Sequence, residues 1–241
     1  MWVDSMNNNM QKIDISKSPR KKTYDWFKTF KNPTYGLTVT MDVTSLVEYT
    51  KKNNQSFFIN MLYIVVNALN SVDELRMRFV DNQPIIYEDI NPAITVMTES
   101  EVFENVRFEN KHNYNDFYEL AKEEIDKAKY QTKLNDKSYN LTNDWNEYYI
   151  TCLPWTTFTG INHPIPEDVH SQTVPRICWS KYTKNGDRYE ISLNITVSHV
   201  FVDGYHLSKV FNKVNELLNN IDATLKWYYV HCKLVILQCY C

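Results

Sequence analysis

The pattern of apolar and polar residues along the chain predicts helices that alternate with strands. Residues 56–69 are apolar on nearly every side, which predicts a buried central helix. In residues 114–130 and 205–218 apolar side chains recur at helical spacing, as expected for amphipathic helices. Residues 44–52 predict a shorter helix, which the threonine or serine at its start is able to cap.

Strand signals lie between these helices, in residues 36–43, 93–97 and 148–153. The clearest signal is a hairpin around Asn185-Gly186, a dipeptide that suits a type I′ turn and joins residues 176–184 to residues 188–199. This combination of helices and strands predicts an α/β fold, a two-layer α/β sandwich with a mixed, largely antiparallel sheet. The chain shows no repeat, linker or domain boundary, so we expect residues 1–241 to form a single domain.

The composition excludes several classes of protein. A hydrophobic fraction of 43% and a charged fraction of 23% are ordinary for a globular chain of 241 residues, and a net charge of −3 argues against general nucleic-acid binding. With only four glycines the chain has no glycine-rich dinucleotide motif. The polar start is not a secretory signal, and the uncharged run at 234–241 is too short to span a bilayer. We therefore expect a cytoplasmic protein that binds neither membranes nor nucleic acid.

The five cysteines divide into two groups. Cys152 and Cys178 lie in strand-like segments and are expected to be reduced core residues. The other three, with a neighbouring histidine, have a spacing that matches no standard zinc site, so we expect no metal; the residues are His231, Cys232, Cys239 and Cys241. The tail at 224–241 has two open interpretations, an added edge strand or a disordered and aggregation-prone segment.

Candidate chemistry appears where the second strand of the hairpin ends. Strand alternation places His199 on the same side as the apolar residues of that strand, and Asp203, Gly204 and a helix follow. One interpretation makes His199 a buried structural histidine and Asp203 a helix cap. The other takes the strand, glycine-containing turn and helix start as a place that presents a reactive side chain. Geometry alone favours the first interpretation.

The amino-acid sequence around His199 indicates a function more specifically than this geometry does. Residues 198–206, SHVFVDGYH, contain the HxxxDG pattern of coenzyme A-dependent acyltransferases. The chain resembles the chloramphenicol acetyltransferases in particular, because DELRM at 73–77, PWTTFTG at 154–160 and Lys181-Tyr182 follow the order and spacing of that family. Thr34-Tyr35, before the strand at 38–44, also fits the pattern of that family. The resemblance covers about residues 12–221 and implies the fold of that family.

The resemblance implies O-acetylation of chloramphenicol, with acetyl-CoA as the co-substrate and inactivation of the antibiotic as the result. His199 would be the general base, with Nε2 taking the proton of the hydroxyl and the other ring nitrogen held by the residue's own carbonyl. Thr151 would donate to the oxyanion of the tetrahedral intermediate. Asp203 would pair with Arg20 to support the site, without orienting the base directly. Without the resemblance, Thr151 is an ordinary strand threonine and Arg20 part of a solvated basic turn.

The resemblance also implies where the two substrates bind. The coenzyme A channel would be lined by Trp155, Lys181, Tyr182 and Cys178, the last in place of a threonine. The acceptor pocket would contain Phe27, Tyr35, Thr95, Phe103 and Tyr149. Without the resemblance, Trp155 and Tyr182 are core aromatics and Lys181 a surface lysine. Several positions depart from the smaller, apolar or different polar groups of the family, namely Lys31, Asn135, Tyr149, His163 and Arg176. An inward-pointing lysine or arginine would disfavour a dichlorinated nitroaromatic acceptor.

At the quaternary level the resemblance implies a homotrimer with each site between two subunits. His199 would come from one subunit, and Thr151 with most of the acceptor pocket from its neighbour. Two alternatives stay open: the same chemistry on another small hydroxyl acceptor, and a non-catalytic trimer that binds a ligand. A dihydrolipoamide acyltransferase core shares HxxxDG, but we see no lipoyl module or Ala/Pro-rich linker in the chain.

Overall fold

The computed structural model describes residues 10–130 and 145–226. The first half contains β1 (Met10–Lys12), α1 (Lys21–Phe27), β2 (Thr34–Asp42), α2 (Thr44–Asn53), α3 (Phe57–Asn70), β3 (Met77–Val80), β4 (Gln83–Tyr87), β5 (Asn91–Met97), β6 (Phe103–Arg107) and α4 (Tyr114–Lys129). The second half contains β7 (Glu147–Leu153), α5 (Val169–Thr173), β8 (Arg176–Ser180), β9 (Thr183–Asn185), β10 (Arg188–Ser198), α6 (Gly204–Asn219) and α7 (Ile221–Thr224). Short 3₁₀ helices occupy Ile15–Lys17 and Asp73–Arg76.

The larger sheet is mixed and has the strand order β2-β10-β8-β7-β5-β6, with β9 paired to β10. β10 runs antiparallel to β2, β8 and β9, and β5 runs antiparallel to β6. The pairs β5–β7 and β7–β8 are parallel. A smaller antiparallel sheet has the order β1-β4-β3. The predicted α/β fold with a mixed, largely antiparallel sheet is confirmed.

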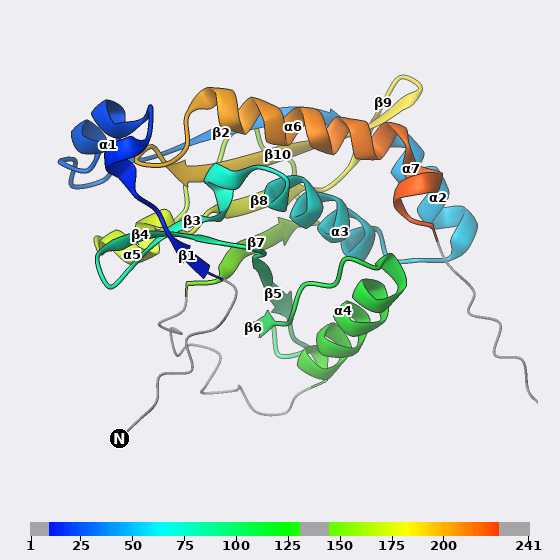
Figure 1. Ribbon diagram of the computed structural model, residues 1–241. Helices are drawn as coiled ribbons and strands as arrows, with labels where there is room; N and C mark the ends of the chain where they lie inside the picture. The colour runs from blue at the N-terminus through cyan, green and yellow to red at the C-terminus, as the bar shows by residue number, and fades with distance from the viewer. Residues whose placement is uncertain (1–9, 131–144, 227–241) are drawn as a thin grey trace, which may run out of the picture.

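Helices α3 and α6 lie together across one face of the large sheet (Figure 1). Their sequence patterns differ because their surroundings differ. α3 contacts α2, α4 and α6, so side chains on all its sides are buried, among them Leu62, Ile64 and Val66. α6 buries one stripe, which includes Val210 and Val214. Each aliphatic side chain buried in this layer stabilises the fold by about 1.5–3 kcal/mol.

The segment between β7 and α5 lies against the polar side chains of β10. His163 Nε2 is 3.1 Å from the side-chain oxygen of Asn194, and the hydroxyl of Ser192 donates to the carbonyl of Phe158. Asn194 and Thr196 are therefore buried although they are polar. This segment, residues 154–168, forms one wall of the cavity described below.

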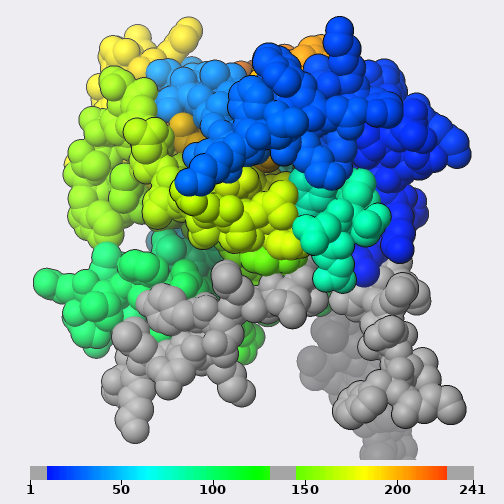
Figure 2. Space-filling model, turned by 90° about the vertical axis from the view of Figure 1, so that its left-hand side faces the viewer, coloured from blue at the N-terminus to red at the C-terminus, as the bar shows by residue number. Residues whose placement is uncertain are grey.

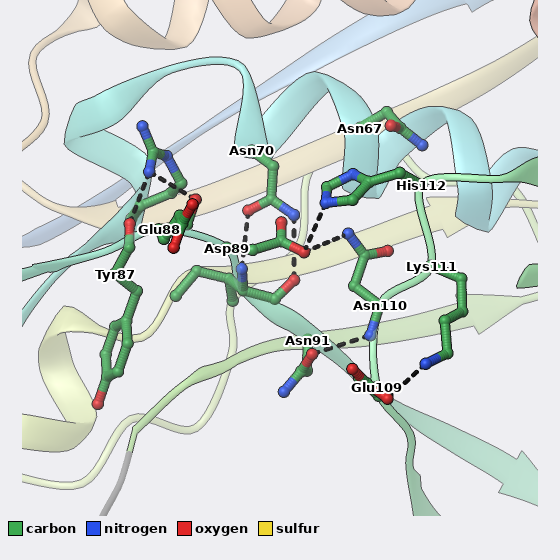
Figure 3. Close-up of polar contacts among 12 residues, drawn as sticks. Asn67, Asn70, Tyr87, Glu88, Asp89, Asn91, Glu109, Asn110, Lys111 and His112 are labelled. Carbon is green, nitrogen blue, oxygen red and sulfur yellow. Dashed lines mark hydrogen bonds and ion pairs between the residues drawn. The ribbon is translucent and has the colours of Figure 1, made fainter. Parts of the chain in front are cut away.

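A polar network ties the end of α3 to the turn before β5 and the loop before α4 (Figure 3). Asn70 donates to the carbonyl of Ile90 (3.0 Å) and accepts its backbone N–H (3.1 Å). Asn110 donates to the Asp89 carboxylate (2.9 Å), which also lies 3.5 Å from Nε2 of His112. These bonds hold the start of β5, the strand that carries Thr95.

The predicted helices at 44–52, 56–69, 114–130 and 205–218 are present as α2, α3, α4 and α6. The expected cap of α2 is wrong, because the capping oxygen comes from the preceding strand. The carboxylate of Asp42 accepts the backbone N–H of Thr44 (3.0 Å) and its hydroxyl (2.6 Å). Thr44 is thus the first helical residue rather than the cap.

The hairpin is present, but two details of its prediction are wrong. Asn185 pairs with Arg188, so the loop residues are Gly186 and Asp187, and of these only Gly186 has a positive φ (60°). A type I′ turn needs positive φ at both positions. The first arm is also split into β8 and β9, because the backbone N–H of Lys181 turns away to the carbonyls of Leu153 and Thr156.

In the part of the chain that the structure describes, no helix is long and apolar enough to cross a membrane. Most of the tail at 224–241 lies outside the described residues, and so do the four residues considered above for zinc. The same holds for Asn135.

Candidate functional site

The end of β10 lies beside α1 (Figure 1), and His199 directly follows this strand. Its backbone N–H donates to the carbonyl of Pro33 (2.9 Å). Its ring stacks on Phe27, with centroids 3.9 Å apart and planes 9° from parallel, and lies 4.5 Å from the ring of Tyr35. The side chain keeps 30% of its surface exposed. The imidazole is thus oriented by aromatic packing yet open to a ligand, which the interpretation as a buried core histidine does not explain.

The two ring nitrogens of His199 have different surroundings. Nδ1 is buried and lies 3.2 Å from the Asp203 carboxylate, without a hydrogen bond in the described part of the chain. The carbonyl of His199, the expected partner of Nδ1, accepts instead from Nη2 of Arg20 (3.3 Å). Negative charge beside Nδ1 favours the tautomer with the proton there, which leaves Nε2 unprotonated. In this structure, Asp203 is therefore the group that faces Nδ1 of His199.

Arg20 and Asp203 form an ion pair that links the start of α1 to the start of α6. The side chain of Arg20 is only 17% exposed, so it does not belong to a solvated basic turn. Burial raises the pKa of Asp203, but hydrogen bonding to Arg20 and its positive charge outweigh burial, and the pKa falls below its usual value. The carboxylate therefore stays ionised at neutral pH.

His206 and Glu74 complete this corner of the molecule, and the sequence prediction missed both. The backbone N–H of Asp203 donates to Nδ1 of His206 (2.9 Å), and Nε2 of His206 lies 3.4 Å from the Glu74 carboxylate. Burial lowers the pKa of His206, which is consistent with a neutral ring that accepts at Nδ1. Both residues lie inside the matched strings DELRM and SHVFVDGYH, which was the available signal.

Thr151 lies on β7 and its hydroxyl is 2.7 Å from that of Thr95. Together with Tyr149 they line a cavity of about 380 Å³. Figure 2 shows the hollow between the β5–β6 hairpin, in green, and the segment after β7, in yellow-green. Phe103, at the start of the edge strand β6, is 47% exposed and does not line this cavity.

Within one chain, Thr151 and His199 lie far apart. The strand register aligns Thr151 with Cys178, and Cys178 with Asn194 of β10. His199 follows Asn194 by five positions along the chain and two strands away from Thr151, a separation of about 15–20 Å. The predicted acceptor residues divide in the same way: Phe27 and Tyr35 lie beside His199, whereas Thr95 and Tyr149 lie beside Thr151.

The residues expected to bind coenzyme A lie mostly in two adjoining hollows that share Phe58, Cys152 and Pro154. Trp155, 65% exposed, lines the larger hollow of about 490 Å³, and it is not a core aromatic. Lys181 and Tyr182 line the smaller one, of about 360 Å³.

Cys178 does not belong to this group, which corrects the expectation that it lines the channel. Its side chain is fully buried, and it lines neither hollow because it shares the sheet face of Thr151. Burial raises the pKa of Cys152 and Cys178 to about 12, so neither thiol ionises at neutral pH.

The residues that depart from the family pattern lie in different places in the structure. Lys31 points to solvent and pairs with Glu167 (3.0 Å). Tyr149, His163 and Arg176 all line the cavity beside Thr151. In the part of the chain that is described, no three His, Cys, Asp or Glu side chains come together as metal ligands.

The sequence profile of the chloramphenicol acetyltransferases matches residues 7–215. The chain belongs to this family. It is 27% identical over 213 residues to chloramphenicol acetyltransferase 3 of Escherichia coli, covering 88% of this chain and 98% of that protein. The chloramphenicol acetyltransferase of Clostridium perfringens is 28% identical over 217 residues, with coverages of 88% and 96%.

Solved structures agree with this assignment. A chloramphenicol acetyltransferase superposes with a TM-score of 0.77 at 26% identity, covering 87% of this chain and 99% of that one. A dihydrolipoamide acetyltransferase of Azotobacter vinelandii shares the fold, with a TM-score of 0.61 at 16% identity and coverages of 85% and 88%. The family predicted from the HxxxDG string and its context is thereby confirmed.

Proposed function

We propose that this protein transfers the acetyl group of acetyl-CoA to a hydroxyl of chloramphenicol, which inactivates the antibiotic. One observation carries the proposal: the HxxxDG histidine is partly exposed, held by two aromatic rings, and has its Nδ1 against a carboxylate. Membership of the chloramphenicol acetyltransferase family supports the choice of reaction and acceptor.

In the proposed mechanism Nε2 of His199 accepts the hydroxyl proton as the oxygen attacks the thioester carbonyl. The hydroxyl of Thr151 donates to the resulting oxyanion, while its oxygen accepts from Thr95 at 2.7 Å. The tetrahedral intermediate then collapses, the C–S bond breaks, and the imidazolium returns the proton to the departing thiolate. General-base catalysis of this kind contributes about 10²–10⁴-fold.

The coenzyme A would lie along the two adjoining hollows. Lys181 offers a positive charge for a phosphate, and Trp155 and Tyr182 offer aromatic surface for the adenine. We place the reaction in the cytoplasm, where acetyl-CoA is available and the free thiols of Cys152 and Cys178 remain reduced.

We further propose that the enzyme is a homotrimer whose sites form between neighbouring subunits. The separation of about 15–20 Å between Thr151 and His199 supports this arrangement, because one chain cannot bring both groups to the same substrate. In a closed ring each subunit can supply His199 to one neighbour and Thr151 to the other.

A complementation experiment tests the shared site. We expect His199→Ala and Thr151→Val chains, each impaired alone, to regain activity when unfolded and refolded together. Equal random mixing restores about a quarter of the sites, because each intact site needs His199 from one chain and Thr151 from another. Thiol release is measured for the mixture and for each variant refolded alone. A mixture no more active than the average of its components would rule out sites shared between subunits.

The acceptor is tested by following thiol release from acetyl-CoA with and without chloramphenicol. Release that depends on the drug and on His199 supports the proposed function. Release with other alcohols but not with chloramphenicol would assign the same chemistry to another acceptor, an alternative that the presence of Arg176 in the cavity favours. Tight drug binding without turnover would instead indicate a non-catalytic binding protein.

A further inference from the structure

A series of polar contacts leads from the 3₁₀ helix at Asp73–Arg76 to the candidate base. Nε2 of His206 lies 3.4 Å from the Glu74 carboxylate, and Nδ1 of the same ring accepts the backbone N–H of Asp203 (2.9 Å). The Asp203 carboxylate in turn lies 3.2 Å from Nδ1 of His199. Because His206 is buried and Glu74 partly buried, these contacts run through the protein rather than across its surface.

The hydrogen bond to Asp203 fixes the protonation state of His206. Because Nδ1 accepts an N–H, it carries no proton, so the proton of the neutral ring is on Nε2, beside the Glu74 carboxylate. A protonated ring would have a second N–H at Nδ1, directed at the N–H of Asp203. Two donors cannot remain in contact at 2.9 Å, so protonation of His206 has to break this bond.

The bond to His206 also helps to direct the carboxylate of Asp203. Asp203 directly precedes α6, and its carbonyl accepts the N–H of His206 (2.9 Å), so the two residues hold each other as in a capping box. The two carboxylate oxygens then have separate partners: Oδ2 pairs with Arg20, and Oδ1 faces Nδ1 of His199. Without the bond to His206, Asp203 would keep Arg20 but lose a constraint that directs Oδ1 towards His199.

The surroundings of His206 keep its ring neutral at pH 7. Burial, the largest effect, lowers its pKa. The two neighbouring carboxylates raise the pKa and the two neighbouring cations lower it, and the net result is a pKa below the usual value. The ring therefore becomes protonated only in more acidic solution. The titratable and charged groups that face it are Glu74, Asp203, Arg20, Lys209 and the phenol of Tyr205.

We propose that His206 and Glu74 are positioning residues for the acetyl transfer: they hold Asp203 against Nδ1 of His199 while His206 is neutral, and protonation of His206 releases this contact. The inference rests on the proposed function and adds a second histidine on which the rate depends. Neither residue is among the described residues that line the cavity beside Thr151 or the two hollows proposed for coenzyme A. Both therefore act through Asp203 and not on a substrate.

Two variants of His206 test the positioning role. His206→Leu removes the acceptor of the Asp203 N–H and is expected to lower kcat at neutral pH by about 10–100-fold, because a small displacement of an orienting group is costly. KM should change little, since the substrate contacts remain. His206→Gln restores an acceptor, because glutamine at this position of a capping box accepts the same N–H, and should keep kcat within about threefold of the wild type. Thiol release with both substrates saturating gives kcat.

The pH profile separates a positioning role from a purely structural one. With acetyl-CoA saturating, kcat/KM for the acceptor should fall in acid as His199 and His206 each take up a proton, so that the limiting slope of its logarithm against pH is about 2. In His206→Gln only the proton on His199 remains, and the slope should be about 1. Glu74→Gln should move the second step to lower pH, because loss of the negative charge disfavours the protonated ring.

His112→Gln is the matched control for the pH profile. His112 also lies near a carboxylate, but its side chain is 76% exposed and it lies in the loop before α4. This variant should keep the slope of the wild type. Rates are compared over the pH range in which each protein stays folded, as judged by its unfolding temperature.

Equal slopes in the wild type and His206→Gln would overturn the role of the His206 proton, even if His206→Leu does not fold. A folded His206→Leu enzyme with unchanged kcat would overturn the positioning role. Either result with an active wild type rejects this inference alone. A wild-type protein that transfers acetyl to no alcohol would reject the proposed function and this inference with it.

Discussion

Replacing His199 with alanine is expected to lower kcat for acetyl transfer by about 10²–10⁴-fold, the contribution typical of a general base. The variant removes Nε2. Among the described residues, the neighbouring His206 does not replace it, because burial lowers the pKa of His206 and its Nδ1 already accepts the Asp203 N–H. The fold should survive, because the His199 side chain is 30% exposed and forms no hydrogen bond with the described residues, and the backbone bonds of this residue remain in the variant. Thiol release at saturating acetyl-CoA and acceptor measures kcat.

His112→Ala is the matched control for this experiment. Figure 3 shows His112 beside the Asp89 carboxylate. The distance between them is 3.5 Å, but the His112 side chain is 76% exposed. Its replacement should leave kcat unchanged. A His199→Ala enzyme that keeps wild-type kcat, with an unchanged unfolding temperature, would show that another group removes the proton.

Replacing Thr151 with valine is expected to lower kcat by about 10²–10³-fold, or about 3–4 kcal/mol in the activation free energy. Valine keeps the shape of threonine and removes only the hydroxyl, which we propose donates to the oxyanion. Because that donor acts on charge that develops in the transition state, kcat should fall while KM changes little. Steady-state kinetics with both substrates varied separates the two effects.

Thr151→Ser restores the hydroxyl and should recover most of the activity lost in Thr151→Val. Thr95→Val tests the hydroxyl that lies 2.7 Å away, and a smaller loss is expected because this group only orients the donor. If Thr151→Val kept full kcat, the oxyanion donor would have to be sought elsewhere, and the assignment of His199 as the base would not be affected.

In one chain, the cavity beside Thr151 lies apart from His199 and the groups that face it. His199, the candidate base, lies with the Arg20–Asp203 pair in one corner, around the start of α6. Arg176 and His163 lie in the separate cavity beside Thr151. If the proposed roles hold, we expect substitutions in that cavity to alter acceptor binding more than proton removal by His199.

Much of the fold was predictable because the spacing of apolar residues along a segment shows which of its sides is buried. The four predicted helices are present, since a stripe of apolar residues or an apolar segment has few other ways to be buried. The errors occurred where distant or neighbouring segments compete for the same backbone groups. Asp42 of β2 caps α2, and contacts of Lys181 with the chain after β7 interrupt the hairpin arm.

The sequence by itself determined the succession of helices and strands, the family, and the identity of the candidate base, because periodicity and the HxxxDG string are properties of neighbouring residues. Only the tertiary structure decided that Nδ1 of His199 faces Asp203, that Thr151 lies about 15–20 Å from His199, and that Arg176 lines the cavity beside Thr151. Alternation along a strand specifies the face on which a side chain lies. Which group meets it there depends on how segments distant in sequence pack together.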